Sequence, residues 1–99
     1  MDEFVLTYTQ TAEKHLKELI QTKSKKSILN AVVKSLKLMS VNLRHPSLRT
    51  HKFSAIKGPE GEDVFESYAQ NNTPGAYRIF WHYGPEKGMI TILNITPHP

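Results

Sequence analysis

The residues from Val64 to Tyr83 alternate between apolar and polar positions in a pattern that predicts one β-hairpin. Two runs rich in aromatic and β-branched residues flank Asn71–Gly75, a cluster of turn-forming residues. A third run, Met89–Ile95, follows a second turn that contains glycine and proline, Gly84–Gly88. Short turns join antiparallel strands, so the second half of the chain predicts an antiparallel meander.

The first half of the chain predicts one short strand and two helices. Residues 4–8 are β-prone, and apolar residues then recur at helical spacing over residues 11–21. After a short polar break, a longer apolar stripe covers about residues 25–42. So short a break predicts an antiparallel helical hairpin. His45–Pro46 ends the second helix, because the residue before a proline is pushed out of helical geometry.

These elements predict an α+β fold with the order β-α-α-β-β-β-β in a single domain, residues 1–99. A chain of 99 residues with 38% hydrophobic composition suits one core. No apolar run approaches the roughly 20 residues of a membrane span, and no secretory leader is visible. We therefore expect a cytoplasmic protein without a membrane partner. The absence of cysteine excludes disulfides and thiol chemistry.

The predicted meander gathers polar side chains on one face. If both turns close symmetrically, Tyr68 faces Arg78, Arg78 faces Asn94, and Glu66 lies one step along. The same register places further residues on this face and leaves a mostly apolar face to pack on the helices; those further residues are Val64, Phe80, His82, Ile90 and Ile92. From geometry alone, an Arg78–Glu66 ion pair on a solvated face, worth under about 1 kcal/mol, is the favoured interpretation.

Positive charge is concentrated before the meander. The chain carries 13 Lys and Arg against nine Asp and Glu, a net charge of +4, which suits a nucleic-acid partner and is also common among ordinary soluble proteins. The segment from Leu43 to Phe53 holds five basic residues, Arg44, His45, Arg49, His51 and Lys52, and His51–Ser54 reads as a short strand. It is interpreted either as a solvated basic loop, the simpler reading, or as a phosphate-binding edge beside the sheet.

Several catalytic and ligand-binding motifs are absent from the sequence, which restricts the reactions that the chain could catalyse. The sequence lacks a glycine-rich phosphate loop, a zinc-ligand spacing and a Gly-x-Ser-x-Gly elbow. We therefore expect neither a metal nor a cofactor, so that any catalysis would depend on Arg, Lys, His, Tyr or Glu. His98 follows the last predicted strand, between two prolines. It is either an exposed bystander or, if the tail folds back toward Arg78, a proton donor or acceptor.

Taken together, the element order and several local motifs resemble the RelE/ParE superfamily of toxins from type II toxin–antitoxin systems. The resemblance extends over nearly the whole chain. The motifs are AEKHL at Ala12–Leu16, HPSLRTHKF at His45–Phe53, VFES at Val64–Ser67, AYRIFW at Ala76–Trp81 and ILNITPH at Ile92–His98.

This resemblance implies a metal-independent, ribosome-dependent mRNA endonuclease. In such enzymes the sheet cradles mRNA in the ribosomal A site, and the ribose 2′-hydroxyl attacks the adjacent phosphate with the help of a base, cations and an acid. By position, Arg78 resembles the family's phosphate-binding arginine, and His98 resembles the C-terminal histidine that acts as acid or base. Glu66 matches a glutamate that is often structural, and we keep it as a possible base.

The other candidate contacts to RNA follow from the basic segment and the polar row. Arg49, His51 and Lys52 would supply a basic edge, and Tyr68 and Asn94 would complete the row beside the phosphate. The family also implies an acidic antitoxin that covers this surface, with operator DNA bound only through the antitoxin complex.

Departures from the family pattern leave two alternatives open. The family often has an arginine within a residue or two after the glutamate, where this chain has Ser67, Tyr68 and Ala69. The tail also lacks the aromatic residue that some ribonuclease members place after the histidine. The alternatives are a ParE-like poison of DNA gyrase and a noncatalytic or inactive homologue that acts through antitoxin and operator-DNA binding.

Overall fold

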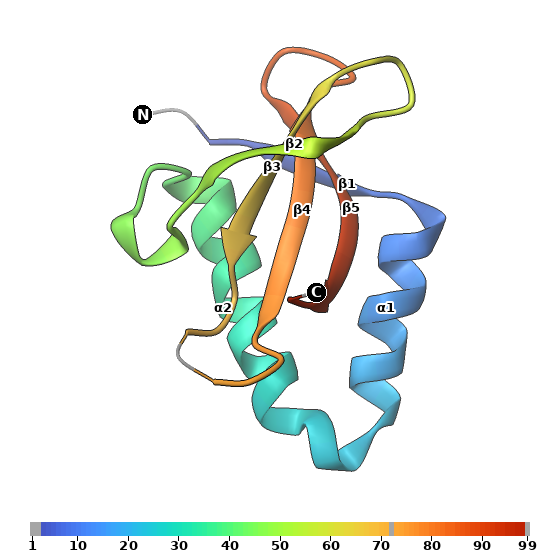
Figure 1. The fold of residues 1–99 in the computed structure, drawn as a ribbon, viewed down its shortest axis with the longest axis vertical. Coiled ribbons are helices and arrows are strands. Elements are labelled where there is room, and N and C mark those ends of the chain that lie inside the picture. The colour runs from blue at the N-terminus through green and yellow to red at the C-terminus, as the bar shows by residue number, and fades with distance from the viewer. Residues whose placement is uncertain (1–2, 72, 99) are drawn as a thin grey trace.

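Helices cover one face of a five-stranded sheet, as the computed structural model shows for residues 3–71 and 73–98 (Figure 1). The elements follow the predicted order and confirm the α+β fold. The first half contains β1 (Val5–Tyr8), α1 (Gln10–Gln21), a 3₁₀ turn (Lys23–Lys25) and α2 (Lys26–Val41). The second half contains a 3₁₀ turn (Pro46–Leu48), β2 (His51–Lys57), β3 (Asp63–Tyr68), β4 (Tyr77–Tyr83) and β5 (Met89–Pro97).

The strand order is β1-β5-β4-β3-β2. Strands β2 to β5 pair antiparallel as predicted, whereas β1 pairs parallel with β5. The connection from β1 to β5 comprises residues 9–88, which satisfies the need of parallel neighbours for a long connection. The first strand therefore joins the sheet beside the last.

Thr9 begins α1 and also ties it to the sheet. Its Oγ1 accepts a hydrogen bond from Ala12 N at 3.0 Å and donates to the Leu93 carbonyl at 2.9 Å. Such a cap contributes about 1 kcal/mol to a helix. The helix starts at a point fixed on β5, so its apolar stripe, which includes the buried Leu19, faces the sheet.

The core lies between the helices and one face of β4 and β5. Ile79 and Trp81 are fully buried against Val32, Leu36 and Met39 of α2. Ile90 and Ile92 belong to this same core, so their predicted position on the opposite face was wrong.

The physical reason is a register shift in the β4–β5 pair. Phe80 pairs with Asn94, but the residue after it, Trp81, pairs with Ile92. The pairing therefore skips Leu93 of β5. One extra residue in a strand inverts every side chain on one side of it. The β4–β5 turn is also one residue longer than the symmetric turn assumed from the sequence, because Tyr83 pairs with Ile90 and not with Met89.

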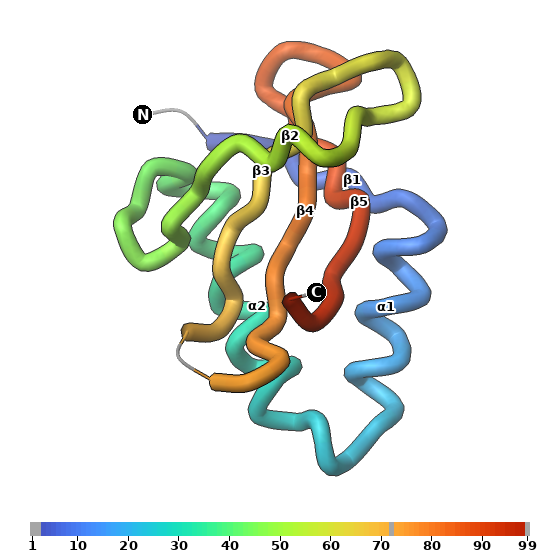
Figure 2. Tube along the Cα trace, viewed as in Figure 1, coloured from blue at the N-terminus to red at the C-terminus, as the bar shows by residue number. Residues whose placement is uncertain are grey.

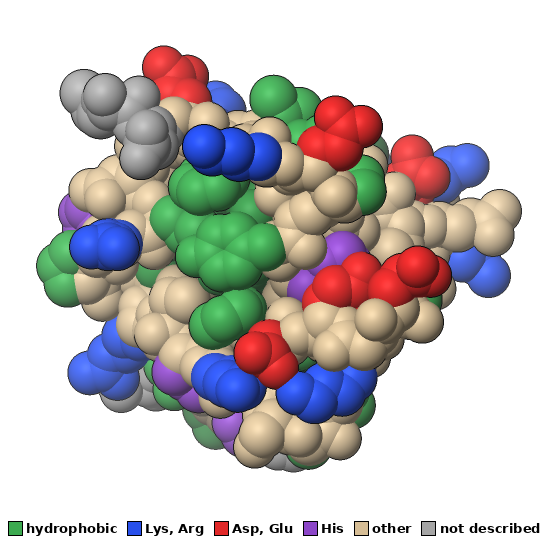
Figure 3. All heavy atoms as spheres, turned by 90° about the horizontal axis from the view of Figure 1, so that it is seen from above, with side chains coloured by type: hydrophobic (Ala, Val, Ile, Leu, Met, Phe, Trp, Pro, Cys, Tyr) green, Lys and Arg blue, Asp and Glu red, His purple; other side chains and the backbone are tan. Residues whose placement is uncertain are grey.

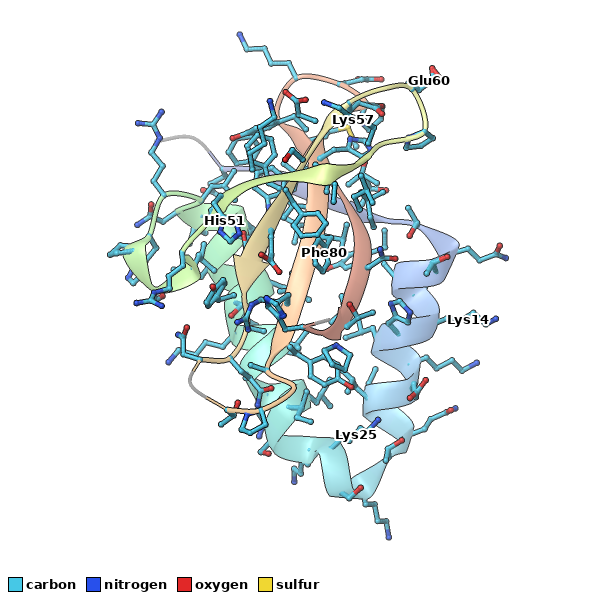
Figure 4. The ribbon with its side chains drawn as sticks, in the orientation of Figure 1. Lys14, Lys25, His51, Lys57, Glu60 and Phe80 are labelled. Atoms are coloured by element: carbon cyan, nitrogen blue, oxygen red, sulfur yellow. The ribbon has the colours of Figure 1, made fainter. Side chains whose placement is uncertain are left out.

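Strand β2 crosses the face of the sheet that the helices leave open. Figure 2 shows its chain passing in front of β3 and β4. Its pairing with β3 is irregular between Lys52 and Lys57, and Phe53 packs edge-on against Phe80 of β4 with ring centroids 5.0 Å apart. Phe80 accordingly lies on the side of β4 that faces β2 (Figure 4). The open face is therefore buried in its centre, and the expected solvated face was wrong.

No helix in the described part of the chain is both long and apolar enough to cross a membrane.

Candidate functional site

The polar row predicted on the meander forms between β3 and β4. Tyr68 pairs with Arg78 and Glu66 pairs with Phe80, which confirms the predicted register of this hairpin. Alternation along the strands then places all three polar side chains on the face away from the helices. Asn94 pairs with Phe80, and Arg78 pairs with Thr96, so the predicted Arg78–Asn94 pair was wrong.

Arg78 is held tightly, with only 7% of its surface exposed. Its Nη1 donates to the Gln70 carbonyl at 2.8 Å and to its neighbour's carbonyl, that of Tyr77, at 3.3 Å. Its guanidinium carbon lies 3.6 Å from the centroid of the Tyr68 ring, a close cation–π contact. An anion that binds this guanidinium must compete with two backbone carbonyls.

Glu66 is buried between the His51 imidazole and the Arg78 guanidinium. Its Oε1 lies 2.7 Å from His51 Nε2, and its Oε2 lies 3.8 Å from Arg78 Nε. Neither Glu66 Oε2 nor Arg78 Nε has a hydrogen-bond partner among the residues that the structure describes. The predicted Arg78–Glu66 pair is thus present, but burial makes it far more consequential than a surface pair, because removing one partner strands a buried charge.

His51 shares a proton with this carboxylate. Its Nδ1 lies 2.9 Å from the Arg49 carbonyl, and a carbonyl only accepts, so Nδ1 carries a proton. Its Nε2 faces Glu66, so one further proton sits between the two groups. Arg49 has a left-handed backbone with φ of 47°, which aims its carbonyl at the imidazole. The His51 side chain is 47% exposed, so the pair is reachable from solvent.

The predicted basic edge divides between two sides of β2. The Arg49 guanidinium lies 5.8 Å from the Tyr68 ring centroid, and the His51 ring contacts the same tyrosine edge-on. Lys52, the next residue, instead pairs with Asp63 at 3.3 Å. Successive side chains point to opposite faces of a strand, so Lys52 stands apart from the row.

Asp63 also binds Lys57, at 2.6 Å. Hydrogen bonds from Lys57 and then Lys52 lower the pKa of the Asp63 carboxyl below its ordinary value. This cluster stabilises the irregular end of the β2–β3 pair and lies outside the polar row.

The C-terminal histidine is placed beside β4. Strand β5 extends to Pro97, opposite Tyr77, and the backbone N–H of His98 donates to the Ala76 carbonyl at 2.8 Å. Strand alternation continued by one residue puts His98 on the face of Thr96, the partner of Arg78. The tail thus continues β5 beside β4, and residue 98 is exposed.

A hydrogen-bonded chain that was not predicted lies beneath the row. Trp81 Nε1 donates to Ser67 Oγ at 2.9 Å, and Ser67 Oγ lies 2.7 Å from Thr50 Oγ1. Ser67 stands where the family pattern often has an arginine, and here it satisfies the indole of a fully buried tryptophan. The only available signal was that a buried Trp requires an acceptor.

Within residues 3–71 and 73–98, no three His, Cys, Asp or Glu side chains gather as a metal site would require.

Solved structures with the same fold are toxins. A YoeB/ParE toxin from Agrobacterium tumefaciens is 8% identical and matches over 100% of both chains with a TM-score of 0.67. The YoeB–YefM toxin–antitoxin complex from Staphylococcus aureus is 15% identical and matches 97% of this chain and 98% of the toxin chain with a TM-score of 0.66. An archaeal RelE–RelB complex from Pyrococcus horikoshii is 12% identical and matches 96% and 94% with a TM-score of 0.64.

The chain therefore has the fold of the RelE/ParE toxins over its whole length, as the sequence motifs indicated. At the level of sequence, no family model and no curated protein matches. Identities this low establish the fold alone, so activity has to be argued from the residues themselves.

Proposed function

We propose that this chain is the toxin of a type II toxin–antitoxin module and acts as a metal-independent, ribosome-dependent mRNA endonuclease. The observation that supports this best is the row formed by His51, Glu66 and Arg78, with His98 on the same face of the sheet. It combines fixed cations with two imidazoles, which are the groups that metal-free phosphodiester cleavage requires.

The reaction assigns a role to each group. His98 accepts the proton of the ribose 2′-hydroxyl as its oxygen attacks the adjacent phosphorus. The bond from phosphorus to the 5′-oxygen breaks, and the proton held between His51 and Glu66 passes to that leaving oxygen. The products are a 2′,3′-cyclic phosphate and a free 5′-hydroxyl. Arg78 and Arg49 stabilise the negative charge on the phosphorane.

Tyr68 has a supporting role in this proposal. It stacks on Arg78 and lies near Arg49, so it keeps the two guanidinium groups on one side of the phosphate. RNA entering the site displaces the Gln70 carbonyl from Arg78 Nη1, because a phosphate oxygen is the stronger acceptor. Asn94 pairs with Phe80 and would contact the bound RNA further along the sheet.

The charge distribution supports an acidic antitoxin as partner. Residues 10–41 hold seven lysines and two glutamates, so the helical hairpin carries +5 while the remainder of the chain is close to neutral. Lys14 projects outward from α1 (Figure 4), and Lys25, in the turn between the helices, lies 3.5 Å from Glu18 Oε1. Similar structures include RelE with RelB, YoeB with YefM and YafQ with DinJ. We propose that the chain acts in the cytoplasm. We also propose that it contacts operator DNA only through the antitoxin complex.

One observation favours a noncatalytic homologue as the second candidate. Arg78 is almost fully buried and its Nη1 already has two acceptors. A chain in which this arginine never releases Gln70 would bind the antitoxin and leave mRNA intact.

Induction of the chain without antitoxin tests the proposal. The wild type is expected to stop translation and to yield messages with 5′-hydroxyl ends at cleavage sites mapped by primer extension. Arg78→Lys keeps a buried cation but loses the paired N–H donors of the guanidinium. It should therefore reduce cleavage about tenfold or more. Lys34→Ala on α2 is the matched control and should cleave normally. Arrest of replication with intact messages would instead indicate gyrase poisoning, and absence of any growth effect would indicate the noncatalytic homologue.

A further inference from the structure

A pocket is formed by the end of α2, the segment that follows it, and residues of β3 and β4. It has a volume of about 780 Å³, within the range of small-molecule sites. One wall is aromatic and comprises Phe4, Phe65 and Tyr83, and the other is basic and comprises Arg44, His45 and Arg49. None of the described residues that line it is acidic. Hereafter it is called the Arg44 pocket.

The aromatic wall is fixed and partly open. The Tyr83 side chain packs edge-on against Phe65 and Trp81, with centroid distances of 5.5 Å and 5.0 Å. Even so, half of Tyr83 is exposed. The end of the molecule where β4 finishes carries a hydrophobic patch with both basic and acidic side chains around it (Figure 3). An aromatic side chain that is fixed by packing and open to solvent can stack against a planar ring of a ligand.

The basic wall presents donors and positive charge. His45 Nδ1 accepts a hydrogen bond from Ser47 N at 3.1 Å, so its Nε2 carries the proton as a donor. Arg44 is exposed, and Arg49 reaches from this pocket to the Tyr68 ring on the other face. Guanidinium groups bind phosphate through paired donors.

From this geometry we infer that the Arg44 pocket binds a nucleotide, with its base against Tyr83 and Phe65 and its phosphate against Arg44 and His45. The ligand is either a free mononucleotide or one residue of an RNA strand. Because Arg49 contributes to both places, a strand in the Arg44 pocket would continue toward the polar row. The inference does not depend on catalysis.

Amide NMR titration of the purified chain tests it, with AMP, adenosine, inorganic phosphate and a short single-stranded RNA as separate probes. We expect saturable shifts at residues 43–45, 49–50 and 83 with AMP, and weaker binding of adenosine or phosphate alone. Shifts with AMP indicate a free nucleotide site, whereas shifts at the same residues with RNA alone assign the site to a strand. The inference is overturned if neither AMP nor the RNA shifts these amides, or if adenosine binds as tightly as AMP.

Variants separate the two walls. Arg44→Ala and Tyr83→Ser should each weaken binding about tenfold, and Tyr83→Phe should retain it. Lys14→Ala removes a lysine on α1 and should change nothing. Emission of Trp81, the single tryptophan of the chain, reports the aromatic wall, because its ring stacks on Phe65 at 4.9 Å. Arg78→Lys is expected to bind AMP normally even where cleavage is lost, so failure of either proposal leaves the other testable.

Discussion

His51 Nε2 lies 2.7 Å from Glu66 Oε1, and the opposite ring nitrogen faces the Arg49 carbonyl. This arrangement fixes the imidazole at both ends and leaves a single proton between it and the carboxylate. The carboxylate in turn faces Arg78. A buried acid, a partly exposed imidazole and a buried guanidinium therefore act as one unit, and each prediction about the site follows from that coupling.

Glu66→Ala should destabilise the fold by about 3 kcal/mol, because it leaves buried Arg78 and half-exposed His51 without their shared counter-charge. Urea unfolding measures the change. Glu60→Ala removes an exposed glutamate from the β2–β3 turn and should change stability by no more than about 0.5 kcal/mol. Equal effects of the two substitutions would contradict the buried network.

The ¹⁵N chemical shifts of the His51 ring should report a protonated Nδ1 in the folded chain. The Arg49 carbonyl has no proton to donate, which is why Nδ1 must carry one. His45 provides an internal comparison, since its Nδ1 accepts from Ser47 N and should be unprotonated when the ring is neutral. An unprotonated Nδ1 at His51 would refute the shared proton.

The two histidines should differ in their response to the leaving group. If the His51 proton goes to the 5′-oxygen, His51→Ala should cleave a 5′-bridging phosphorothiolate message far better than the normal one, because sulfur leaves without protonation. His98→Ala should stay slow on both substrates, because the base is missing. The fold should survive His98→Ala, since the substitution keeps the backbone N–H that donates to the Ala76 carbonyl. If the phosphorothiolate instead rescued His98→Ala, His98 would be the acid and His51 the base.

Asp63 should contribute stability that depends on pH. Its pKa is lowered by Lys57 and Lys52, so the folded state holds the ionised form more strongly than the unfolded chain does. The contribution is therefore full above the ordinary pKa of about 3.9 and disappears as the pH falls through the lower value in the folded state. Asp63→Asn should be less stable than wild type near neutrality, with the difference vanishing in acid. A difference that persists in acid would assign the effect to something other than charge.

Ser67→Ala should cost about 1–3 kcal/mol, because it leaves the indole N–H of fully buried Trp81 without an acceptor. Urea unfolding and Trp81 emission measure the two consequences together. Ser27→Ala on the exposed side of α2 is the matched control and should be nearly neutral. A neutral Ser67→Ala would mean that Thr50 Oγ1 takes over as acceptor.

Periodicity along the chain determined most of the architecture. Apolar spacing predicted both helices, alternation and turn residues predicted the meander, and the Tyr68–Arg78 register followed from the length of one turn. These features depend on residues close in sequence, so a linear pattern contains them. The motifs then indicated the toxin fold that the similar structures bear out.

Only the tertiary structure decided how the polar face is used. The longer β4–β5 turn and the skipped residue Leu93 together moved Asn94 away from Arg78, and β2 covered the face that the pattern left open. The His51–Glu66 contact depends on the pairing of β2 with β3. Bulges and crossing strands arise from packing between residues far apart in sequence, and alternation along one strand carries no record of what lies across it.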